Sequence, residues 1–365
     1  MGREPVLVDG VRSPIGKAGG AYREVRPDAL LARVIDALLA RTGLRADLID
    51  DLQIGCVTQF GEQSGNVARL AGLLSGLPPT VPAVTINRAC GSAQEAIHAA
   101  ARAVAAGDVR YVIAGGVESM TRSPMFSDAD GSGTAASRLA AINPALAARY
   151  EMIEQGRSAE RLASLHGLER EALDRWAWNS HRRAAAAADA GWTDAELAEV
   201  NGLDPVGNPV CLTRDEGIRS NPDLEKMGRL RPVFRPDGVV TAGNASQMSD
   251  GAAVVLVADR EAAAADGLRP RARFRSRVAL GGDPTLQLDA IIPATRLAFE
   301  RAGVSLADID HFEVNEAFAS VVVAWQRAFD VDPERINPAG GAIAHGHPLG
   351  ATGAVLMTRL LHRLE

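Results

Sequence analysis

The sequence has few aromatic residues and no concentration of one charge sign. Aromatic residues make up 4% of the chain although 47% is hydrophobic, so Ala, Val, Leu and Ile must build the core. Such a core is typical of α/β proteins in which helices cover a sheet. The net charge of -6 and the absence of a basic run argue against nucleic acid as a partner. A chain of 365 residues is expected to form two or more compact halves.

Long apolar runs and paired cysteines are also missing. No apolar run is long enough to cross a membrane, and the N-terminal residues MGREPVLVDG do not resemble a signal peptide. We therefore expect a cytoplasmic protein without membrane insertion. The three cysteines, Cys56, Cys90 and Cys211, are widely spaced and form neither a disulfide framework nor a CxxC metal pair.

The chain is organised around residues 83–104, AVTINRACGSAQEAIHAAARAV. Alternating apolar residues at the start predict a buried strand, and small residues at helical spacing predict a tightly packing helix after it. Cys90 falls in the turn between them, where free N–H groups and the helix dipole would favour a thiolate. The position suits a nucleophile, although a single cysteine can also be a small buried hydrophobic residue.

Periodicity predicts further elements on either side of this stretch. We expect strands at 5–11, 51–57, 111–114 and 251–259, and a helix at 29–41 closed by Gly43. Residues 118–243 have a different texture, with charged helices at 158–166 and 169–190. They are interpreted as an inserted subdomain that lies over the core.

The pattern begins again after residue 270. Residues 271–281 predict a strand, residues 290–301 a helix, and residues 311–318 a strand that runs into a helix. Continuing this register aligns the turn of His347 with the turn of Cys90. Two half-domains whose helix N-termini meet would place a thiol beside an imidazole, as thiol catalysis requires.

The second repeat has no counterpart of the strands at 111–114 and 251–259. A parallel sheet without them would expose edge backbone and an apolar face. We therefore expect that the sequence is cut short at Glu365, with a natural deletion as the alternative.

Five motifs resemble those of the thiolase family, in the family's order and over essentially the whole chain. They are NRACGSAQEA around Cys90, AGGVESM at 114–120, TAGNASQMSDGAA at 241–253, NEAF at 315–318 and GGAIAHGHPLGATGA at 340–354. The resemblance implies an α/β fold of two duplicated βαβαβαββ halves in a five-layered αβαβα core. The halves would be residues 1–117 plus 244–268 and, incomplete, residues 269–365, with a loop subdomain at 118–243 that binds coenzyme A.

The resemblance also implies an activity. Thiolases cleave a 3-ketoacyl-CoA with CoA to acetyl-CoA and a shortened acyl-CoA, or run the reverse condensation. By position, Cys90 resembles the acylated nucleophile and His347 the base that then helps hold the thioester oxygen. Asn315 would position a water that forms an oxyanion hole with His347. CoA- or substrate-facing positions match Ser246, Arg219 and, with NEAF, Phe318.

Further implications concern ligands and assembly. CoA would be a substrate, with no permanently bound cofactor and no metal, and the protein would be a homodimer or homotetramer acting on acyl-CoA. Cys56 and Cys211 match no functional position and are interpreted as structural.

Two departures from the family pattern bear on the reaction. Thiolases carry a second cysteine in a CxGGG-type motif about thirty residues past the GHP histidine, where it serves as acid and base at the substrate α-carbon. This sequence ends before that point, which would cost about 10²–10⁴-fold or more in proton transfer. Residues 154–156 are Glu-Gln-Gly where short-chain biosynthetic thiolases usually have His-Met-Gly. This favours a degradative enzyme with a longer or bulkier acyl chain.

Several alternatives stay open for single features. A metal site at His345 and His347 would lack further ligands, because no carboxylate or cysteine lies near them in the sequence. Asn315 and Glu316 can cap the helix that follows them, which is compatible with catalysis. Residues 340–353 lack the GK[ST] of a phosphate loop.

Two other functions are weighed against the thiolase reaction. One is a thiolase-like CoA-binding or scaffold protein without turnover, which the missing motif favours. The other is a related condensing enzyme, against which NEAF and GHP argue.

Overall fold

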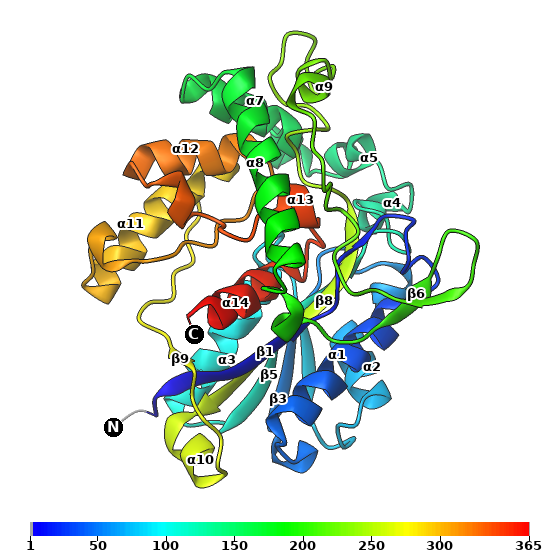
Figure 1. Ribbon diagram of the computed structural model, residues 1–365, viewed down its shortest axis with the longest axis vertical. Helices are drawn as coiled ribbons and strands as arrows, with labels where there is room; N and C mark the ends of the chain where they lie inside the picture. The colour runs from blue at the N-terminus through cyan, green and yellow to red at the C-terminus, as the bar shows by residue number, and fades with distance from the viewer. Residues whose placement is uncertain (1–2, 365) are drawn as a thin grey trace.

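The computed structural model describes residues 3–364 and has one large sheet at its centre (Figure 1). Its strands lie in the order β4-β3-β5-β8-β1-β9, and β2 pairs with β8. β3 is parallel to β4 and β5, whereas β8 is antiparallel to both β5 and β1. The strands are β1 (Pro5–Arg12), β2 (Gly16–Lys17), β3 (Asp51–Gly55), β4 (Ala83–Ile86), β5 (Tyr111–Ser119), β8 (Ser249–Asp259) and β9 (Ala272–Arg273).

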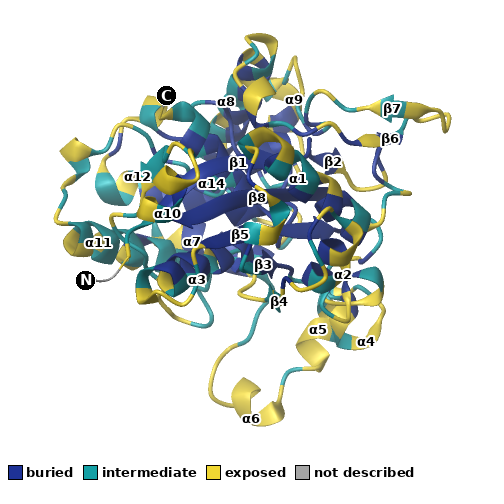
Figure 2. Cartoon of the chain, turned by 90° about the horizontal axis from the view of Figure 1, so that it is seen from below, coloured by how far each residue is buried: buried dark blue, intermediate teal, exposed yellow. Residues whose placement is uncertain are grey.

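The two central strands, β5 and β8, are buried along their whole length. Both faces of a central strand are covered by helices, which is why their sequences are nearly continuous runs of apolar and small residues. β5 continues past the predicted end at 114, through the pair Gly115–Gly116. Glycine is needed at 115, since a Cβ there would lie 2.0 Å from the carbonyl oxygen of Ala253 on β8. Figure 2 shows β1, β5 and β8 buried at the centre and α5 and α6 exposed at the margin.

Two pairs of helices cover the sheet. α1 (Pro27–Thr42) and α2 (Val67–Leu74) lie on one face, and α3 (Ser92–Ala106) and α14 (Thr352–Arg363) on the other. α1 ends as predicted, with Gly43 in the left-handed region at φ 66°. α14 packs on β8, β1 and α3, so the last helix of the second repeat belongs to the core of the first.

A second apolar core lies away from the sheet, around the indole of Trp325. Helices from the predicted inserted subdomain and from the second repeat build it together. They are α7 (Gln155–Leu165), α8 (Arg170–Asp189), α11 (Ile291–Ala302) and α12 (Ala319–Phe329). The predicted helices at 158–166, 169–190 and 290–301 are thus confirmed within a few residues. The predicted domain boundaries stay a prediction.

The strands predicted for the second repeat are the main difference. Of residues 271–281 only Ala272–Arg273 forms a strand, and residues 311–318 contribute two isolated bridges, from Phe312 to Ile336 and from Phe318 to Ala245. In the first repeat the central strands β5 and β8 follow α3. Within residues 3–364 no strand follows α14. Among the described residues, β1 is the only strand that pairs with 271–281, and 311–318 has no strand beside it, and a strand without a ladder is not stable.

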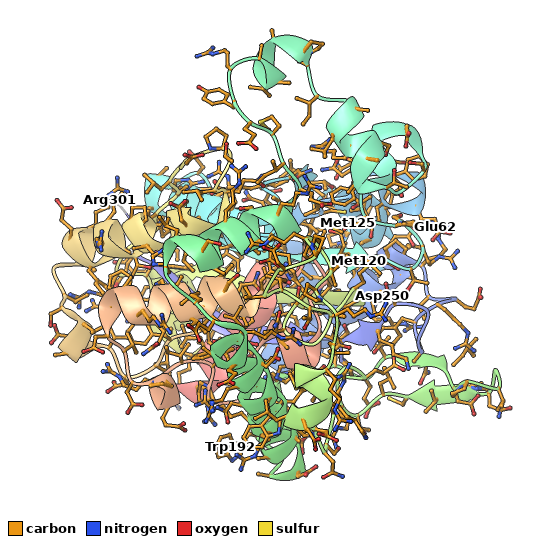
Figure 3. The ribbon with its side chains drawn as sticks, turned by 90° about the horizontal axis from the view of Figure 1, so that it is seen from above. Glu62, Met120, Met125, Trp192, Asp250 and Arg301 are labelled. Atoms are coloured by element: carbon orange, nitrogen blue, oxygen red, sulfur yellow. The ribbon has the colours of Figure 1, made fainter. Side chains whose placement is uncertain are left out.

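Shorter elements complete the chain. They are α4 (Ser127–Asp130), α5 (Ala135–Ala140), α6 (Pro144–Ala147), β6 (Asn201–Leu203), β7 (Pro209–Cys211), α9 (Leu224–Gly228), α10 (Arg260–Ala265) and α13 (Ala342–His345). Figure 3 places Met120 close to Asp250, where the end of β5 meets the start of β8. Among residues 3–364, no helix combines the length and apolarity needed to cross a membrane.

Candidate active site

Cys90 lies in a turn that a serine side chain holds together. Ser92 Oγ accepts a hydrogen bond from the backbone N–H of Arg88 at 2.8 Å and donates one to the carbonyl of Ala89 at 2.6 Å. Ala89 has a φ of 46°, a left-handed conformation that costs energy for a residue with a Cβ. Gly91 caps α3, so the thiol of Cys90 is presented half-buried just before the helix begins.

His347 lies in the corresponding turn before α14. Its backbone N–H is held by Gln247 O at 3.0 Å and Ser249 Oγ at 3.1 Å. Its ring bridges two groups, with Nδ1 2.6 Å from Thr352 Oγ1 and Nε2 3.2 Å from Cys90 Sγ. The structure therefore brings the thiol of one repeat into hydrogen-bonding distance of the imidazole of the other.

Asn315 completes this group from a third segment. Its Nδ2 lies 3.4 Å from His347 Nε2, and its Oδ1 has no hydrogen-bond partner among residues 3–364. The expectation that Asn315 caps the next helix is wrong, because α12 begins at Ala319 with Phe318 as its N-cap. The side chain is instead directed at the His347 ring.

Burial sets the protonation of the pair. Burial and the charge of Glu118 raise the pKa of Cys90 to about 11, and burial lowers the pKa of His347 to about 4. Burial and the charge of Glu118 thus oppose the thiolate that the helix N-terminus is expected to favour. Near neutral pH the site holds a neutral thiol and a neutral imidazole.

Glu118 ties the turn of His347 to the central sheet, a role not predicted from the sequence. It lies on β5, and its carboxylate accepts from the N–H groups of Val57, Thr58 and Gly350 at 2.9, 3.0 and 2.8 Å and from the Gln63 amide at 2.9 Å. Burial nevertheless raises the pKa of Glu118. A charged residue inside the apolar strand AGGVES was the only sequence indication of this anchor.

Glu316 anchors the neighbour of Asn315 in the same way. Its buried carboxylate accepts hydrogen bonds from α8 and from the segment before α14. The donors are Trp176 Nε1 at 3.0 Å, Ser180 Oγ at 2.7 Å, Asn337 Nδ2 at 2.9 Å and the Ile343 N–H at 3.3 Å. A buried carboxylate with several donors is a rigid fixed point, so the backbone beside Asn315 is held in place.

The residues expected to face CoA are divided between two places. Ser246 lies beside the Asn315 segment, since its N–H donates to Ala317 O at 3.0 Å. Phe318 lies in the same region, packed edge-on against Phe234 with ring centroids 6.0 Å apart. Arg219 is exposed beside α8, where its N–H donates to His181 Nδ1 at 3.2 Å.

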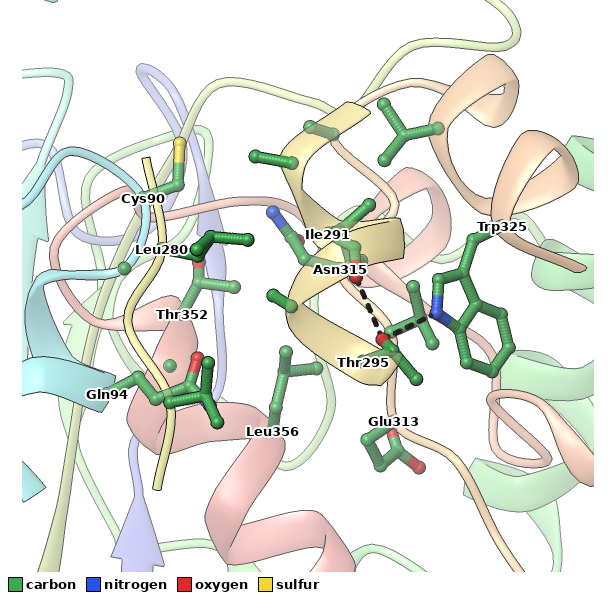
Figure 4. Close-up of a pocket in the computed structure, with 18 of the residues that line it drawn as sticks. Cys90, Gln94, Leu280, Ile291, Thr295, Glu313, Asn315, Trp325, Thr352 and Leu356 are labelled. Atoms are coloured by element: carbon green, nitrogen blue, oxygen red, sulfur yellow. Dashed lines mark hydrogen bonds between the residues drawn. The ribbon is translucent and has the colours of Figure 1, made fainter. Parts of the chain in front are cut away.

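A cavity of about 730 Å³ opens beside Cys90 (Figure 4). Cys90, Gln94, Thr352 and Leu356 line one side of it, and residues of α11 and the segment before α12 line the other. Glu313, on this second side, has no hydrogen-bond partner in the described chain. Burial raises its pKa to about 8, against the opposing charge of Arg359.

His345 does not form a metal pair with His347. Its Nδ1 lies 2.5 Å from Asp215 Oδ2 and its Nε2 lies 2.7 Å from Ala339 O. Burial would raise the pKa of Asp215, but Arg12 and His345 outweigh it and hold that pKa well below its usual range. Within residues 3–364 no group of three His, Cys, Asp or Glu side chains is placed to hold a metal ion.

Comparison with known families accounts for both repeats. Residues 5–261 match the family model described as thiolase, N-terminal domain, and residues 268–365 match thiolase, C-terminal domain. The chain therefore belongs to the thiolase family. This confirms the family resemblance of the five motifs.

Individual relatives and structures are similar over nearly the whole chain. The 3-ketoacyl-CoA thiolase of Erwinia tasmaniensis is 44% identical over 368 residues, covering 99% of this chain and 92% of the relative. That of Salmonella typhimurium is 43% identical with the same coverage. A crystal structure of the Bacillus anthracis acetyl-CoA acetyltransferase has a TM-score of 0.90 at 34% identity, covering 100% of this chain and 92% of the other. The crystal structure of human mitochondrial 3-ketoacyl-CoA thiolase has a TM-score of 0.90 at 33% identity, covering 99% of this chain and 92% of the other. The thiolase-like α/β fold is thereby confirmed.

Proposed function

We propose that this chain is an acyltransferase that cleaves a 3-ketoacyl-CoA with CoA, giving acetyl-CoA and a shortened acyl-CoA through an acyl-Cys90 intermediate. The observation that carries the proposal is the distance of 3.2 Å between Cys90 Sγ and His347 Nε2. The bacterial relatives at 43–44% identity bear the name 3-ketoacyl-CoA thiolase, which supports a degradative direction.

The first half-reaction acylates Cys90. The sulfur attacks the 3-keto carbon while His347 Nε2 takes the thiol proton. The bond between C2 and C3 of the substrate then breaks, and its electron pair becomes the enolate of acetyl-CoA. His347 then gives up the proton it took, and the enolate takes up one proton to become acetyl-CoA, so the imidazole is neutral again when CoA binds. A neutral histidine with a pKa of about 4 is available as a base at physiological pH.

The second half-reaction returns the thiol. CoA loses its proton to His347, and its sulfur attacks the thioester carbon of acyl-Cys90. The Cys90–acyl bond breaks, the shortened acyl-CoA forms, and Cys90 regains a proton. A thioester suits this exchange because the leaving and attacking groups are both thiolates.

Asn315, Ser246, Arg219 and Phe318 are assigned roles around these steps. Asn315 Nδ2 lies 3.4 Å from His347 Nε2, close enough for both groups to hold one water against the thioester oxygen. Ser246 and Phe318 flank the Asn315 segment and would contact the pantetheine arm. Arg219, exposed in the 118–243 subdomain, would meet the CoA phosphates. CoA is then a substrate, and the proposal includes no permanently bound cofactor.

Intact-mass measurement tests the proposal. The purified protein is incubated with 3-ketoacyl-CoA of graded chain length, and acetyl-CoA release is followed in parallel. We expect an acyl adduct on the wild type and on Cys211→Ala, whose thiol is exposed, but none on Cys90→Ala. CoA binding with neither adduct nor acetyl-CoA would refute turnover and support the CoA-binding or scaffold alternative.

A homodimer or homotetramer is part of the proposal, and the exposed apolar side chains around the edge strand β4 support it. Leu73 and Leu74 on α2 are 51% and 59% exposed, and Val84 on β4 is 43% exposed. β4 pairs only with β3 among the described strands, and a bare apolar sheet edge is a template for another chain. The cytoplasmic location remains a prediction.

Light scattering after size-exclusion chromatography tests the assembly. We expect the wild type to elute as a dimer or larger and Leu74→Asp to shift toward the monomer. Val206→Asp, at an 82% exposed side chain in the β6–β7 turn, is the control and should keep the wild-type mass. A monomeric wild type would contradict this part of the proposal.

A further inference from the structure

We propose that Thr352 is a positioning residue that holds His347 in the tautomer with a hydrogen on Nδ1 and a free lone pair on Nε2. The consequence for catalysis rests on the proposed function. The tautomer itself does not, because it follows from hydrogen bonds that are independent of any substrate.

The hydrogen-bond directions around Thr352 decide the tautomer. A threonine hydroxyl has one hydrogen to donate, and Oγ1 lies 3.0 Å from the carbonyl of Pro348, four residues earlier. That carbonyl can only accept, and Oγ1 is the donor to it, beside the backbone N–H groups of Ala351 and Thr352 at 2.9 and 3.0 Å. The remaining lone pairs of Oγ1 face His347 Nδ1 at 2.6 Å. The hydrogen of this second bond must then come from the ring, so Nδ1 carries it.

The opposite ring nitrogen is thereby left without a hydrogen. In neutral imidazole only one nitrogen is protonated, and burial keeps His347 neutral near pH 7 by lowering its pKa to about 4. The lone pair of Nε2 therefore points at Cys90 Sγ, 3.2 Å away. In the other tautomer an N–H would point at a thiol, and the thiol hydrogen would lose its acceptor.

Neither group can move easily to another partner. Thr352 is the first residue of α14 and is buried, and the backbone of His347 is held by Gln247 and Ser249. The hydroxyl thus belongs to the first residue of a helix that packs on the central sheet. It faces Nδ1, the ring nitrogen of His347 that is not directed at Cys90.

This arrangement has a measurable signature in the reactivity of Cys90. A neutral thiol and a neutral imidazole exchange their proton without any change in net protonation. The reactive thiolate–imidazolium form then has a constant population between the two pKa values, about 4 and about 11. Without a free Nε2, only solvent can deprotonate the thiol, and the thiolate rises tenfold per pH unit up to the thiol pKa.

The experiment measures alkylation of Cys90 by iodoacetamide between pH 5.5 and 9.5, with intact mass as the readout. Cys211→Ala is the background, since Cys211 is exposed, and Cys56 is buried. The background protein should react at a rate nearly independent of pH. Thr352→Val, which keeps the shape but lacks the hydroxyl, should react at least about tenfold more slowly at pH 7, with a rate that climbs with pH. Thr352→Ser restores the hydroxyl and should restore the flat profile.

A second measurement determines the tautomer directly in the wild type. It tests the inference even if the Thr352→Val protein does not fold. Long-range ¹H–¹⁵N correlation on ¹⁵N-histidine-labelled protein, with His347→Asn for assignment, should show His347 protonated at Nδ1. Protonation at Nε2 in the wild type would overturn the inference, as would a Thr352→Val protein with an unchanged flat profile. Neither measurement uses acyl-CoA. The inference can therefore fail while the proposed acyl transfer stands, and the acyl transfer can fail while the inference stands.

Discussion

The two repeats of this chain share a turn that leads into a helix, but among residues 3–364 only the first repeat has several paired strands of its own. The helix α3, which follows the turn of Cys90, packs on β3, β4 and β5, and the strands β5 and β8 fill the centre of that sheet. Segments of the second repeat instead line a cavity of about 730 Å³ together with Cys90 and Gln94 of the first. The turn of His347 is nevertheless well held, because Glu118 and α14 attach it to the first-repeat sheet. The base is therefore positioned by the sheet of the other repeat.

The largest expected effect comes from removing the group that the second repeat supplies. His347→Asn should lower the rate of Cys90 acylation by about 10³-fold or more, since no other described side chain within hydrogen-bond reach of Cys90 Sγ is a base. His166→Asn, at the end of α7, is the matched control and should stay within about twofold of the wild type. Single-turnover acylation measures both. A loss of less than about tenfold would show that the two turns do not act as a pair.

Hydrogen exchange compares the two repeats directly. Within residues 3–364 the backbone N–H groups of 275–281 make no hydrogen bonds, whereas those of β8 are paired on both sides. We expect amides in 275–281 to exchange at least about a hundredfold faster than those of β8. Mass spectrometry of peptic peptides resolves the two regions. Equal protection would mean that a strand pairs with 275–281, and the contrast between the repeats would disappear.

The contact between the repeats can be broken by one methyl group. A Cβ on Gly116 of β5 would lie 1.9 Å from the carbonyl oxygen of Gly350, in the turn of His347. Gly116→Ala should therefore destabilise the fold by about 1–3 kcal/mol and slow acylation by moving His347 away from Cys90. Gly281→Ala meets nothing within 4 Å and serves as the control. Urea unfolding and the acylation assay read the two effects, and equal stability of both variants would refute the contact.

The smallest expected effect concerns the buried carboxyl in the second repeat. The pKa of Glu313 is raised to about 8, so the native state holds its proton more tightly than the unfolded chain. This contribution to stability is fully present below the usual glutamate pKa and is lost as the pH rises through 8. Glu313→Gln mimics the protonated carboxyl. The decrease in Tm between pH 5 and 8 should therefore be smaller in this variant than in the wild type by about 2–4 °C. Glu300→Gln, on the exposed side of α11, should keep the wild-type slope.

Features that depend on neighbouring residues were predictable. The strand at 5–11, the helix closed by Gly43 and the strand-to-helix turn of Cys90 all follow from periods of two and 3.6 residues and from the left-handed preference of glycine. The alignment of the repeats also placed Cys90 and His347 in equivalent turns. These features need only local backbone geometry, which the side chains of a short segment specify.

Features that depend on distant partners were not predictable. Residues 271–281 have the composition of a strand, but among the described residues only β1 pairs with them, over Ala272–Arg273. The helix start after Cys90 was visible in the sequence, but the burial and the nearby Glu118 charge that raise the thiol pKa were not. The anchoring roles of Glu118 and Glu316 depend on donors tens of residues away.

The sequence by itself determined the family, the helices and the first-repeat strands, because motifs and periodicity are properties of contiguous residues. Only the tertiary structure decided that Cys90 Sγ meets His347 Nε2 at 3.2 Å, with Asn315 beside them. It also decided that both groups of the pair are neutral and that Thr352 fixes which nitrogen carries the hydrogen. The physical reason is that distance, hydration and hydrogen-bond direction arise from three segments far apart in the chain, and packing alone brings them together.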